Sequence, residues 1–166
     1  SSMSRATTKV NGDSYFFNPY GVRQTGMIRM VNQSGEEMVG YFGDSNSDGK
    51  MVTGKKTNLN VDGDSGTYYF ADSGSDKGAG LNGTKDGYLY YEGKLQKADK
   101  AAKYEVFQLE TDGKKYLVNS SGKVMKNTKV TDGNDQKWEV AGNGTIKVYG
   151  SDEIAELVVP EATATY

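Results

Sequence analysis

Aromatic side chains are the residues of this sequence that could do chemistry, because the usual catalytic groups are missing. The chain of 166 residues contains 12 Tyr, 5 Phe and 1 Trp, but no His and no Cys. Without these two residue types, Ser-His-Asp and Cys-His catalysis, thiol nucleophiles and His- or Cys-ligated metal sites are excluded. Exposed aromatic rings can instead stack on the C–H faces of sugars, while nearby Asn, Asp and Gln side chains bond the hydroxyls.

Five aromatic residues are the candidate ligand-binding positions. They are Tyr41, Tyr69, Tyr90, Tyr91 and Trp138. In a triplet such as Tyr68-Tyr69-Phe70, alternation along a strand puts the outer two rings on one face and the middle ring on the other. The alternative is that these rings fill the core between hairpins, as aromatic residues often do in small cores.

The acidic residues show no pattern of a hydrolytic site. Glycoside hydrolysis requires two carboxyl groups at a fixed separation across a cleft. Several of the 22 acids stand in Asp-Gly turns or beside lysines, and Glu36-Glu37 and Asp152-Glu153 are adjacent pairs. Neighbours in a strand point to opposite faces, so neither pair could share a substrate. We therefore expect no catalytic residues and no cofactor.

One segment resembles the first half of a calcium loop. Asp44-Ser45-Asn46-Ser47-Asp48-Gly49 fits the pattern D-x-N-x-D-G, but Lys55 stands where the bidentate Glu of such a loop is required. Similar polar turns recur at Asp62-Gly63-Asp64 and at residues 72–76. The sequence predicts a hairpin turn and no metal site, with weak calcium binding as the alternative.

Charge and hydropathy limit the partners. The net charge is −2, acids and lysines are interspersed, and no basic stripe that could neutralise phosphates runs along the chain, so we expect no nucleic acid partner. The longest apolar cluster, Leu157-Val158-Val159-Pro160, is far shorter than the roughly 20 residues that span a bilayer, so we expect no membrane insertion. The opening residues 1–5 have no apolar core of a signal peptide, so a secreted protein would be represented here by a fragment or a mature form.

The elements that position the aromatic residues form a repeat. An aromatic or β-branched cluster recurs at steps of about 20 to 30 residues, each followed by a polar turn with glycine and then an apolar residue. The clusters are Tyr15-Phe16-Phe17, Tyr41-Phe42, Tyr68-Tyr69-Phe70, Tyr88-Leu89-Tyr90-Tyr91, Tyr116-Leu117-Val118 and Trp138-Glu139-Val140. Such clusters favour strands, and Asp-Gly, Ser-Gly and Asn-Gly supply the positive φ of tight hairpin turns.

These units predict an all-β fold of stacked β-hairpin repeats, solenoid-like or an elongated meander. A single hairpin is marginal in water, so each must pack its aromatic face on the next. We expect tails at residues 1–12 and 157–166, aromatic–glycine hairpins over 13–97 and more divergent hairpins over 98–156. Residues 95–103 are the only stretch with a helix-like composition, and we expect a loop there.

The repeat resembles the cell-wall-binding repeats of Firmicutes, a family that includes choline-binding modules, streptococcal glucan-binding repeats and the carbohydrate-binding region of clostridial toxins. The best match runs from Gly40-Tyr41-Phe42 to Asp48-Gly49-Lys50-Met51-Val52-Thr53-Gly54. Tyr68-Tyr69-Phe70 and Gly122-Lys123-Val124-Met125 match in part. The resemblance covers about residues 13–150 and implies a non-catalytic module that binds a glycan.

The chain departs from the family at one position of each repeat. Family units carry a Trp after the glycine that ends the hairpin, and this Trp helps to form the choline cage. Here those places hold Gly26-Met27, Gly54-Lys55 and Gly83-Thr84. Because a quaternary ammonium is held by several aromatic faces, one Trp in the whole chain cannot supply a cage in every repeat.

The sequence thus predicts a carbohydrate-binding repeat module of a larger, secreted Gram-positive protein, located at the cell wall or cell surface. Its partner would be a cell-wall polymer or another glycan. The alternative is a structural spacer or adhesin stalk with no small ligand of its own. A binding module should expose a contiguous patch with at least two aromatic residues among polar side chains, whereas a spacer should pack every Tyr.

Overall fold

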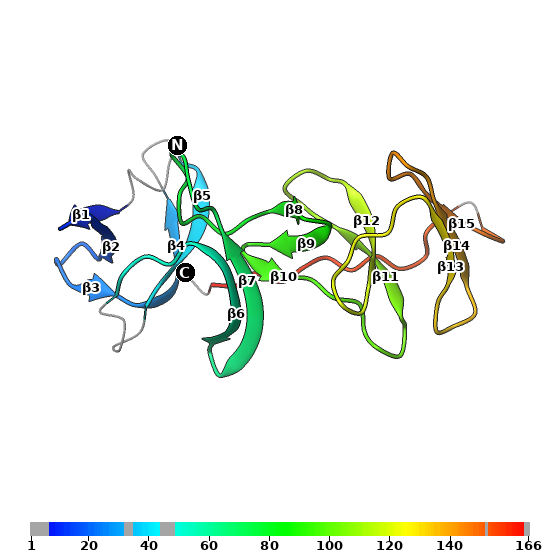
Figure 1. Ribbon diagram of the computed structural model, residues 1–166, viewed down its shortest axis with the longest axis horizontal. Coiled ribbons are helices and arrows are strands. Elements are labelled where there is room, and N and C mark those ends of the chain that lie inside the picture. The colour runs from blue at the N-terminus through cyan, green and yellow to red at the C-terminus, as the bar shows by residue number, and fades with distance from the viewer. Residues whose placement is uncertain (1–6, 32–34, 44–48, 152, 165–166) are drawn as a thin grey trace. The chain divides into compact units, whose positions relative to one another are not determined.

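The computed structural model describes residues 7–31, 35–43, 49–151 and 153–164, and these residues form strands, turns and loops without a helix (Figure 1). The strands are β1 (Thr8–Val10), β2 (Asp13–Phe17), β3 (Arg23–Gln24), β4 (Gly26–Val31), β5 (Glu37–Phe42), β6 (Gly54–Val61), β7 (Asp64–Phe70), β8 (Gly83–Lys85), β9 (Tyr88–Tyr91), β10 (Lys94–Leu95), β11 (Tyr104–Gln108), β12 (Lys115–Asn119), β13 (Thr128–Thr131), β14 (Lys137–Val140) and β15 (Ile146–Val148). The predicted all-β class with hairpin repeats is confirmed. In the described part of the chain, no helix that could span a membrane is found.

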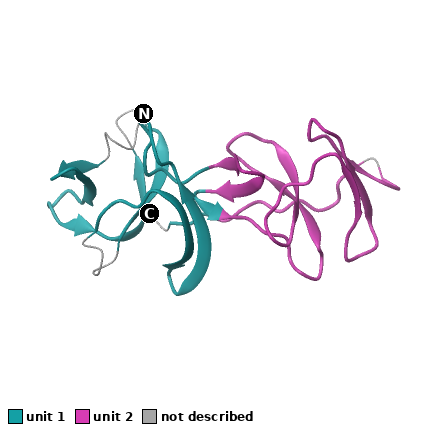
Figure 2. Ribbon diagram, viewed as in Figure 1, with its two compact units in different colours: residues 1–81, 92–94, 162–166 teal, residues 82–91, 95–161 magenta. Residues whose placement is uncertain are grey.

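The chain divides into two compact units, coloured separately in Figure 2. Unit 1 comprises residues 1–81, 92–94 and 162–166, and unit 2 comprises residues 82–91 and 95–161. The chain passes from unit 1 to unit 2 at 81/82, returns to unit 1 at 91/92, enters unit 2 again at 94/95 and ends in unit 1 after 161/162. Residues 96–103 form a loop with a turn at 100–102, as expected.

All six aromatic clusters lie on strands. They fall on β2, β5, β7, β9, β12 and β14. Each of these strands pairs with an antiparallel neighbour: β2 with β1 and β3, β5 with β4, β7 with β6, β9 with β8, β12 with β11, and β14 with β13 and β15. Local sequence therefore determines the strands, because β-branched and aromatic residues fit the pleated, half-buried surface.

Two-residue turns close several hairpins. Asn11-Gly12, Asp62-Gly63 and Asp86-Gly87 each have two consecutive residues at positive φ, the geometry of a type I′ turn. Glu92-Gly93, between β9 and β10, has the same geometry with φ of 47° and 86°. Asn and Asp tolerate this conformation because their short side chains can hydrogen-bond to the nearby backbone. The longer Glu side chain has no such local compensation.

Two hydrophobic clusters form the core of unit 1. In the first, Ile28, Met30 and Phe42 are buried, and Phe16 packs against them with its ring centroid 6.1 Å from that of Phe42. In the second, Tyr68 and Phe70 stack at 6.1 Å with an interplanar angle of 2° and contact Tyr41. Tyr68 and Phe70 point to one face of β7 because they are two residues apart, as alternation predicts.

Unit 2 also contains two clusters. One buries Leu89, Phe107, Leu109 and Val118, and the other buries Val106, Leu117, Trp138 and Val140. Val106 and Phe107 alternate on β11, and Leu117 and Val118 alternate on β12, so this hairpin contributes one face to each cluster. Burial on both faces explains why these strands read as continuous apolar runs.

A loop of unit 2 tolerates no side chain at one position. Gly133 donates its N–H to Ala102 O at 2.8 Å. A Cβ at Gly133 would overlap the backbone carbonyl oxygen of Ala101. Close approach of two backbone segments is therefore the reason for glycine here.

A buried ion pair ties the C-terminal segment into unit 1. Arg29 donates to both carboxylate oxygens of Glu92, at 2.7 Å each, and Glu92 also accepts the Thr163 N–H at 2.9 Å. Thr163 Oγ1 donates in turn to Glu92 O at 3.0 Å. Burial alone would raise the pKa of Glu92, but the hydrogen bonds from Arg29 and Thr163 outweigh it, so the pKa lies below its ordinary value. Glu92 therefore stays ionised within the pair.

Parts of both expected tails are ordered. Thr8–Val10 forms β1 and pairs with Asp13–Tyr15 across the Asn11-Gly12 turn. Val158 bridges Phe107 in parallel, donating to Val106 O at 2.8 Å and accepting from Gln108 N at 2.9 Å. Residues 8–10 and Val158 thus have backbone partners, because the edges of β2 and β11 accept them, and the sequence alone does not locate these edges.

Candidate functional site

Three of the five predicted ligand-binding residues lie in the core. Tyr41 is 8% exposed and Tyr90 is 2% exposed. Trp138 is 8% exposed, and its indole N–H donates to Asp132 Oδ2 at 3.0 Å. Rings this well covered fill space between strands, and as ligand-binding positions these three residues stay predictions.

Asp132 holds the Trp138 ring in place. Its other carboxylate oxygen accepts the N–H groups of Asn134 and Gln136 at 2.8 and 3.0 Å. Burial would raise the pKa of Asp132, yet the bonds from the indole and the two N–H groups bring it below its ordinary value. The single Trp is therefore a structural anchor with both its ring and its N–H engaged.

Tyr69 and Tyr91 are only half-buried. The Tyr69 hydroxyl donates to Asp72 Oδ2 at 3.4 Å, and Tyr91 packs beside the cluster of Leu89 and Phe107. Within unit 2, Tyr91 and Trp138 pack in two different clusters, and Tyr41 packs in a cluster of unit 1. As ligand-binding positions, Tyr69 and Tyr91 stay predictions.

An aromatic patch that the sequence did not single out lies on the sheet β1-β2-β3. Register places Val10, Asp13, Tyr15, Phe17 and Arg23 on one face of this sheet, which we call the outer aromatic face. Val10 is 45% exposed and Phe17 is 36% exposed, although both are apolar. The opposite face carries Phe16, which enters the core, so the sheet is amphipathic with a partly apolar exterior.

The geometry of the outer aromatic face is held by local contacts. The Tyr15 and Phe17 ring centroids are 6.5 Å apart, and the Arg23 guanidinium lies 5.7 Å from the Tyr15 centroid. The adjoining turn is fixed by Asn18 Oδ1, which accepts the Tyr20 and Val22 N–H groups at 3.0 and 2.9 Å. Tyr20 itself is 90% exposed at this turn. Two aromatic rings and a cation thus form a platform, with a third ring at the turn beside it.

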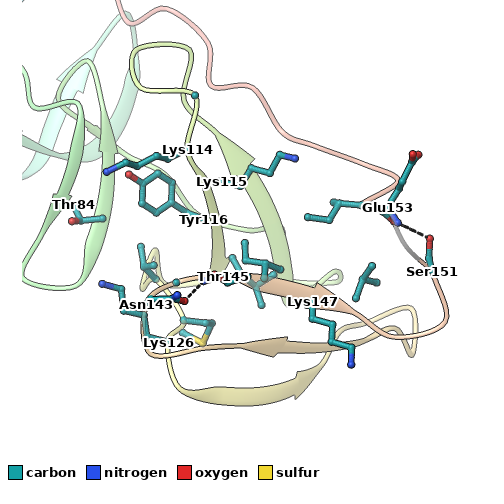
Figure 3. Close-up of a pocket in the computed structure, with 18 residues that line it drawn as sticks. Thr84, Lys114, Lys115, Tyr116, Lys126, Asn143, Thr145, Lys147, Ser151 and Glu153 are labelled. Atoms are coloured by element: carbon teal, nitrogen blue, oxygen red, sulfur yellow. Dashed lines mark hydrogen bonds between the residues drawn. The ribbon is translucent and has the colours of Figure 1, made fainter.

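Unit 2 carries a groove of about 1220 Å³ (Figure 3). Its floor includes Leu117, Met125, Ile146 and Val148, which also contact the cluster around Trp138. Tyr116 is the only aromatic residue among the described residues that line it. Burial and the hydrogen bond to Asp112 Oδ2, 3.1 Å long, raise the pKa of Tyr116 to about 12, so its phenol stays protonated.

The rim of the groove is polar and mainly basic. Lys114, Lys115 and Lys126 line it together with hydroxyl and amide side chains, and Glu153 is the one acid in the described lining. In Figure 3, Lys114 and Lys126 flank Tyr116 with their amines toward the same end of the groove. Lys147 also lines the groove, but its amine lies 5.1 Å from the Tyr149 ring centroid and points away in Figure 3.

No metal centre is found in the described part of the chain, where no three acids, His or Cys lie close enough to hold an ion. Residues 44–48 of the segment that resembles a calcium loop lie outside the described residues. The two candidate surfaces are the outer aromatic face of unit 1 and the groove of unit 2.

Comparison with known proteins identifies the architecture. No protein-family model and no curated protein sequence matches the chain. Among solved structures, CbpF in complex with ipratropium superposes with a TM-score of 0.53 at 28% identity over 85% of this chain. This likeness supports an architecture of choline-binding-like repeats. It spans only 38% of the CbpF chain to which it is similar.

Other choline-binding-like structures are more distant. CbpJ from Streptococcus pneumoniae has a TM-score of 0.39 at 24% identity. The match covers 84% of this chain and 47% of the CbpJ chain. The modular autolysin LytC from Streptococcus pneumoniae, in complex with a synthetic peptidoglycan ligand, has a TM-score of 0.44 at 11% identity. The match covers 86% of this chain and 33% of the LytC chain.

The aromatic motif alone does not indicate where the two candidate surfaces lie. Tyr15 and Phe17 belong to the first recognised cluster, and their outward direction follows from the core position of Phe16 between them. Alternation could have found this face had the core side of β2 been known. The groove gave no sequence signal, because its lysines come from separate segments of the chain.

Proposed function

We propose that the chain is a non-catalytic module of a secreted Gram-positive surface protein and that it binds a cell-wall or other extracellular glycan. The observation that carries this proposal is the outer aromatic face, where Tyr15 and Phe17 lie side by side and partly exposed. Flat aromatic surface of this kind offers a stacking platform for the C–H face of a sugar ring. The likeness to CbpF supports a role at the cell surface.

Polar groups around the platform suit a hydrated ligand. Asp13 lies on the same face as Tyr15, and Lys50 Nζ stands 3.6 Å from its carboxylate. Arg23, opposite Phe17 in the register, can donate several hydrogen bonds to hydroxyls. A patch with two aromatic residues among such groups is what a binding module requires and what a uniformly packed spacer would lack.

A saccharide fits this surface better than a quaternary ammonium. A cation needs several aromatic faces turned toward it, whereas Tyr15 and Phe17 are tilted by 47° at 6.5 Å and Arg23 already lies over the Tyr15 ring. Trp138 is engaged in the core. We expect that millimolar choline leaves the melting temperature unchanged.

The test is retention of the protein on purified polymers: peptidoglycan, teichoic acid and α-glucan. We expect wild-type protein to sediment with at least one of them. A Phe17→Ala/Tyr20→Ala variant should lose about ten-fold in affinity, since each stacking ring contributes about 0.5–1.5 kcal/mol. Val31→Ala is the matched control, because Val31 is 58% exposed in the same unit but lies outside this face.

The structural spacer is the second candidate, and the burial of Tyr41, Tyr90 and Trp138 favours it. A spacer uses its aromatic residues only to stack hairpins on one another. If wild-type protein is retained by none of the polymers and choline gives no thermal shift, the spacer replaces the binding module. A clear thermal shift with choline would instead assign the family's known type of ligand to this chain.

A further inference from the structure

The geometry points to the groove of unit 2 as a second binding site, whose ligand is an anionic polysaccharide. This site shares no residue with the outer aromatic face and does not depend on the ligand of that face. Its chemistry differs as well, since the groove joins positive charge to an apolar floor. Three properties of the groove carry the inference.

The first property is its charge. Lys114, Lys115 and Lys126 line the groove and are exposed, while Glu153 is the one acid in the described lining. No described carboxylate lies within 4.0 Å of these three amines. A local excess of positive charge in a chain of net charge −2 attracts anions into the groove.

The nearest acid on the same turn does not cancel this charge at close range. Asp112 accepts the Lys114 backbone N–H at 2.8 Å and the Tyr116 hydroxyl at 3.1 Å, one with each oxygen. Its carboxylate is therefore directed at the turn and at the phenol. The amines of Lys114 and Lys126 remain the charged groups that flank the Tyr116 ring (Figure 3).

The second property is the apolar floor. Met125, Ile146 and Ile154 are only partly buried, and Tyr116 adds an aromatic ring beside them. Sugar rings present apolar C–H surface that such a floor covers, while Thr84 and Thr145 on the rim can bond hydroxyls. A small inorganic anion would use the lysines and leave this floor without a function.

The third property is the spacing of the cations. Lys114 and Lys115 belong to the turn before β12 and the start of that strand, whereas Lys126 follows β12. In Figure 3, Lys115 extends along the groove away from the end that Lys114 and Lys126 share. Lysine acts as a point charge, so separated lysines match the repeated charges of a chain better than one compact anion.

The experiment measures binding of the full chain to two anionic polymers by calorimetry at low salt. Polygalacturonate supplies carboxylates and phosphorylated dextran supplies phosphates on a sugar chain, and neutral dextran is the comparison. We expect both anionic polymers to bind more tightly than dextran and to weaken as salt rises. A Lys114→Gln/Lys126→Gln variant should lose about 25-fold, because each charge contact at about 4 Å in water changes affinity about five-fold.

A matched variant separates the groove from general charge. Lys97→Gln/Lys100→Gln removes the same two charges from exposed positions of unit 2 that do not line the groove. We expect this control to bind within two-fold of wild type, with unchanged circular dichroism for both variants. Binding of one anionic polymer alone still supports the site and identifies its preferred anion.

Two results would overturn the inference. One is equal loss in the groove variant and in the control, because binding would then follow net charge. The other is binding of dextran as tight as that of the anionic polymers. The two sites share no residue, so Phe17→Ala/Tyr20→Ala should leave binding of polygalacturonate and phosphorylated dextran unchanged. The proposal for the groove can therefore fail while the proposal for the outer aromatic face holds, and the reverse.

Discussion

The ion pair of Arg29 and Glu92 allows a test in which two physical effects have opposite signs. Glu92 occupies the first position of a type I′ turn at φ 47°, where Asn is strongly preferred. Replacing Glu92 with Asn therefore relieves backbone strain and should stabilise the turn by about 1 kcal/mol. The same replacement removes the carboxylate that pairs with Arg29 and accepts the Thr163 N–H.

The loss is the larger effect. Removing one partner of a buried ion pair costs about 3–5 kcal/mol because the other charge is left uncompensated. The lower end applies here, since the Arg29 side chain is 17% exposed and Glu37, 3.6 Å away, can partly compensate it. A loss of about 3 kcal/mol against a gain of about 1 leaves unit 1 less stable by about 2 kcal/mol, or about 30-fold in its unfolding equilibrium.

Hydrogen exchange followed by mass spectrometry resolves the two units. In Glu92→Asn, we expect amides of β4 and β5 to exchange about 30-fold faster. Fluorescence of Trp138, the only Trp of the chain and a residue of unit 2, provides an internal control in the same sample. Unchanged or slower exchange in β4 and β5 would refute the reasoning, because turn preference would then outweigh the ion pair.

A second variant and a pH series test the charge itself. Arg29→Leu combined with Glu92→Asn should recover stability relative to Glu92→Asn alone, since the guanidinium that lost its Glu92 partner is removed as well. The folded pKa of Glu92 is lowered from 4.5 by Arg29 and Thr163, whose bonds outweigh burial. Its contribution to stability is therefore complete above pH 4.5 and is lost as the pH falls through the lower folded pKa. The gap between wild type and Glu92→Asn should narrow below pH 4.5.

Further variants probe unit 2. Gly133→Ala should prevent native packing of its loop because the new Cβ meets a backbone carbonyl, whereas Gly142→Ala, with only an ordinary contact at 3.4 Å, should shift the urea midpoint little. Equal midpoints for these two would contradict the close approach. Trp138→Phe should lower the free energy of unfolding by about 1–3 kcal/mol, since buried Asp132 loses a hydrogen bond; circular dichroism in urea measures this. Tyr116→Phe should remove one phenol that ionises near pH 12, and absorbance at alkaline pH follows this ionisation. If the variant instead loses a phenol that ionises near pH 10, the raised pKa of Tyr116 is refuted.

The repeated aromatic clusters and glycine turns explain why much of the fold was predictable from the sequence. All six aromatic clusters form strands, and the Asn-Gly and Asp-Gly pairs at Asn11, Asp62 and Asp86 close two-residue turns. These are local effects, decided within about ten residues by side-chain shape and by which residues accept positive φ. The loop at residues 96–103 was predictable for the same reason.

The direction of the aromatic rings was not predictable in the same way. Tyr41, Tyr90 and Trp138 were candidate ligand positions, and each is covered by neighbours. Alternation states that successive residues face opposite sides, but it does not state which side is the core. Only the packing of strands from distant parts of the chain decided that Phe16 points inward and Phe17 outward.

The sequence by itself determined the class of the protein: strands, hairpin turns, a repeat, and the absence of histidine and cysteine chemistry. Tertiary structure decided which side chains share a surface. Residue 163 reaches Glu92, Val158 joins the edge of β11, and Lys126 shares a groove with Lys114. Each of these contacts joins segments whose separation along the chain gives no periodic signal, because a binding surface depends on distances in space while a repeat depends only on spacing in sequence.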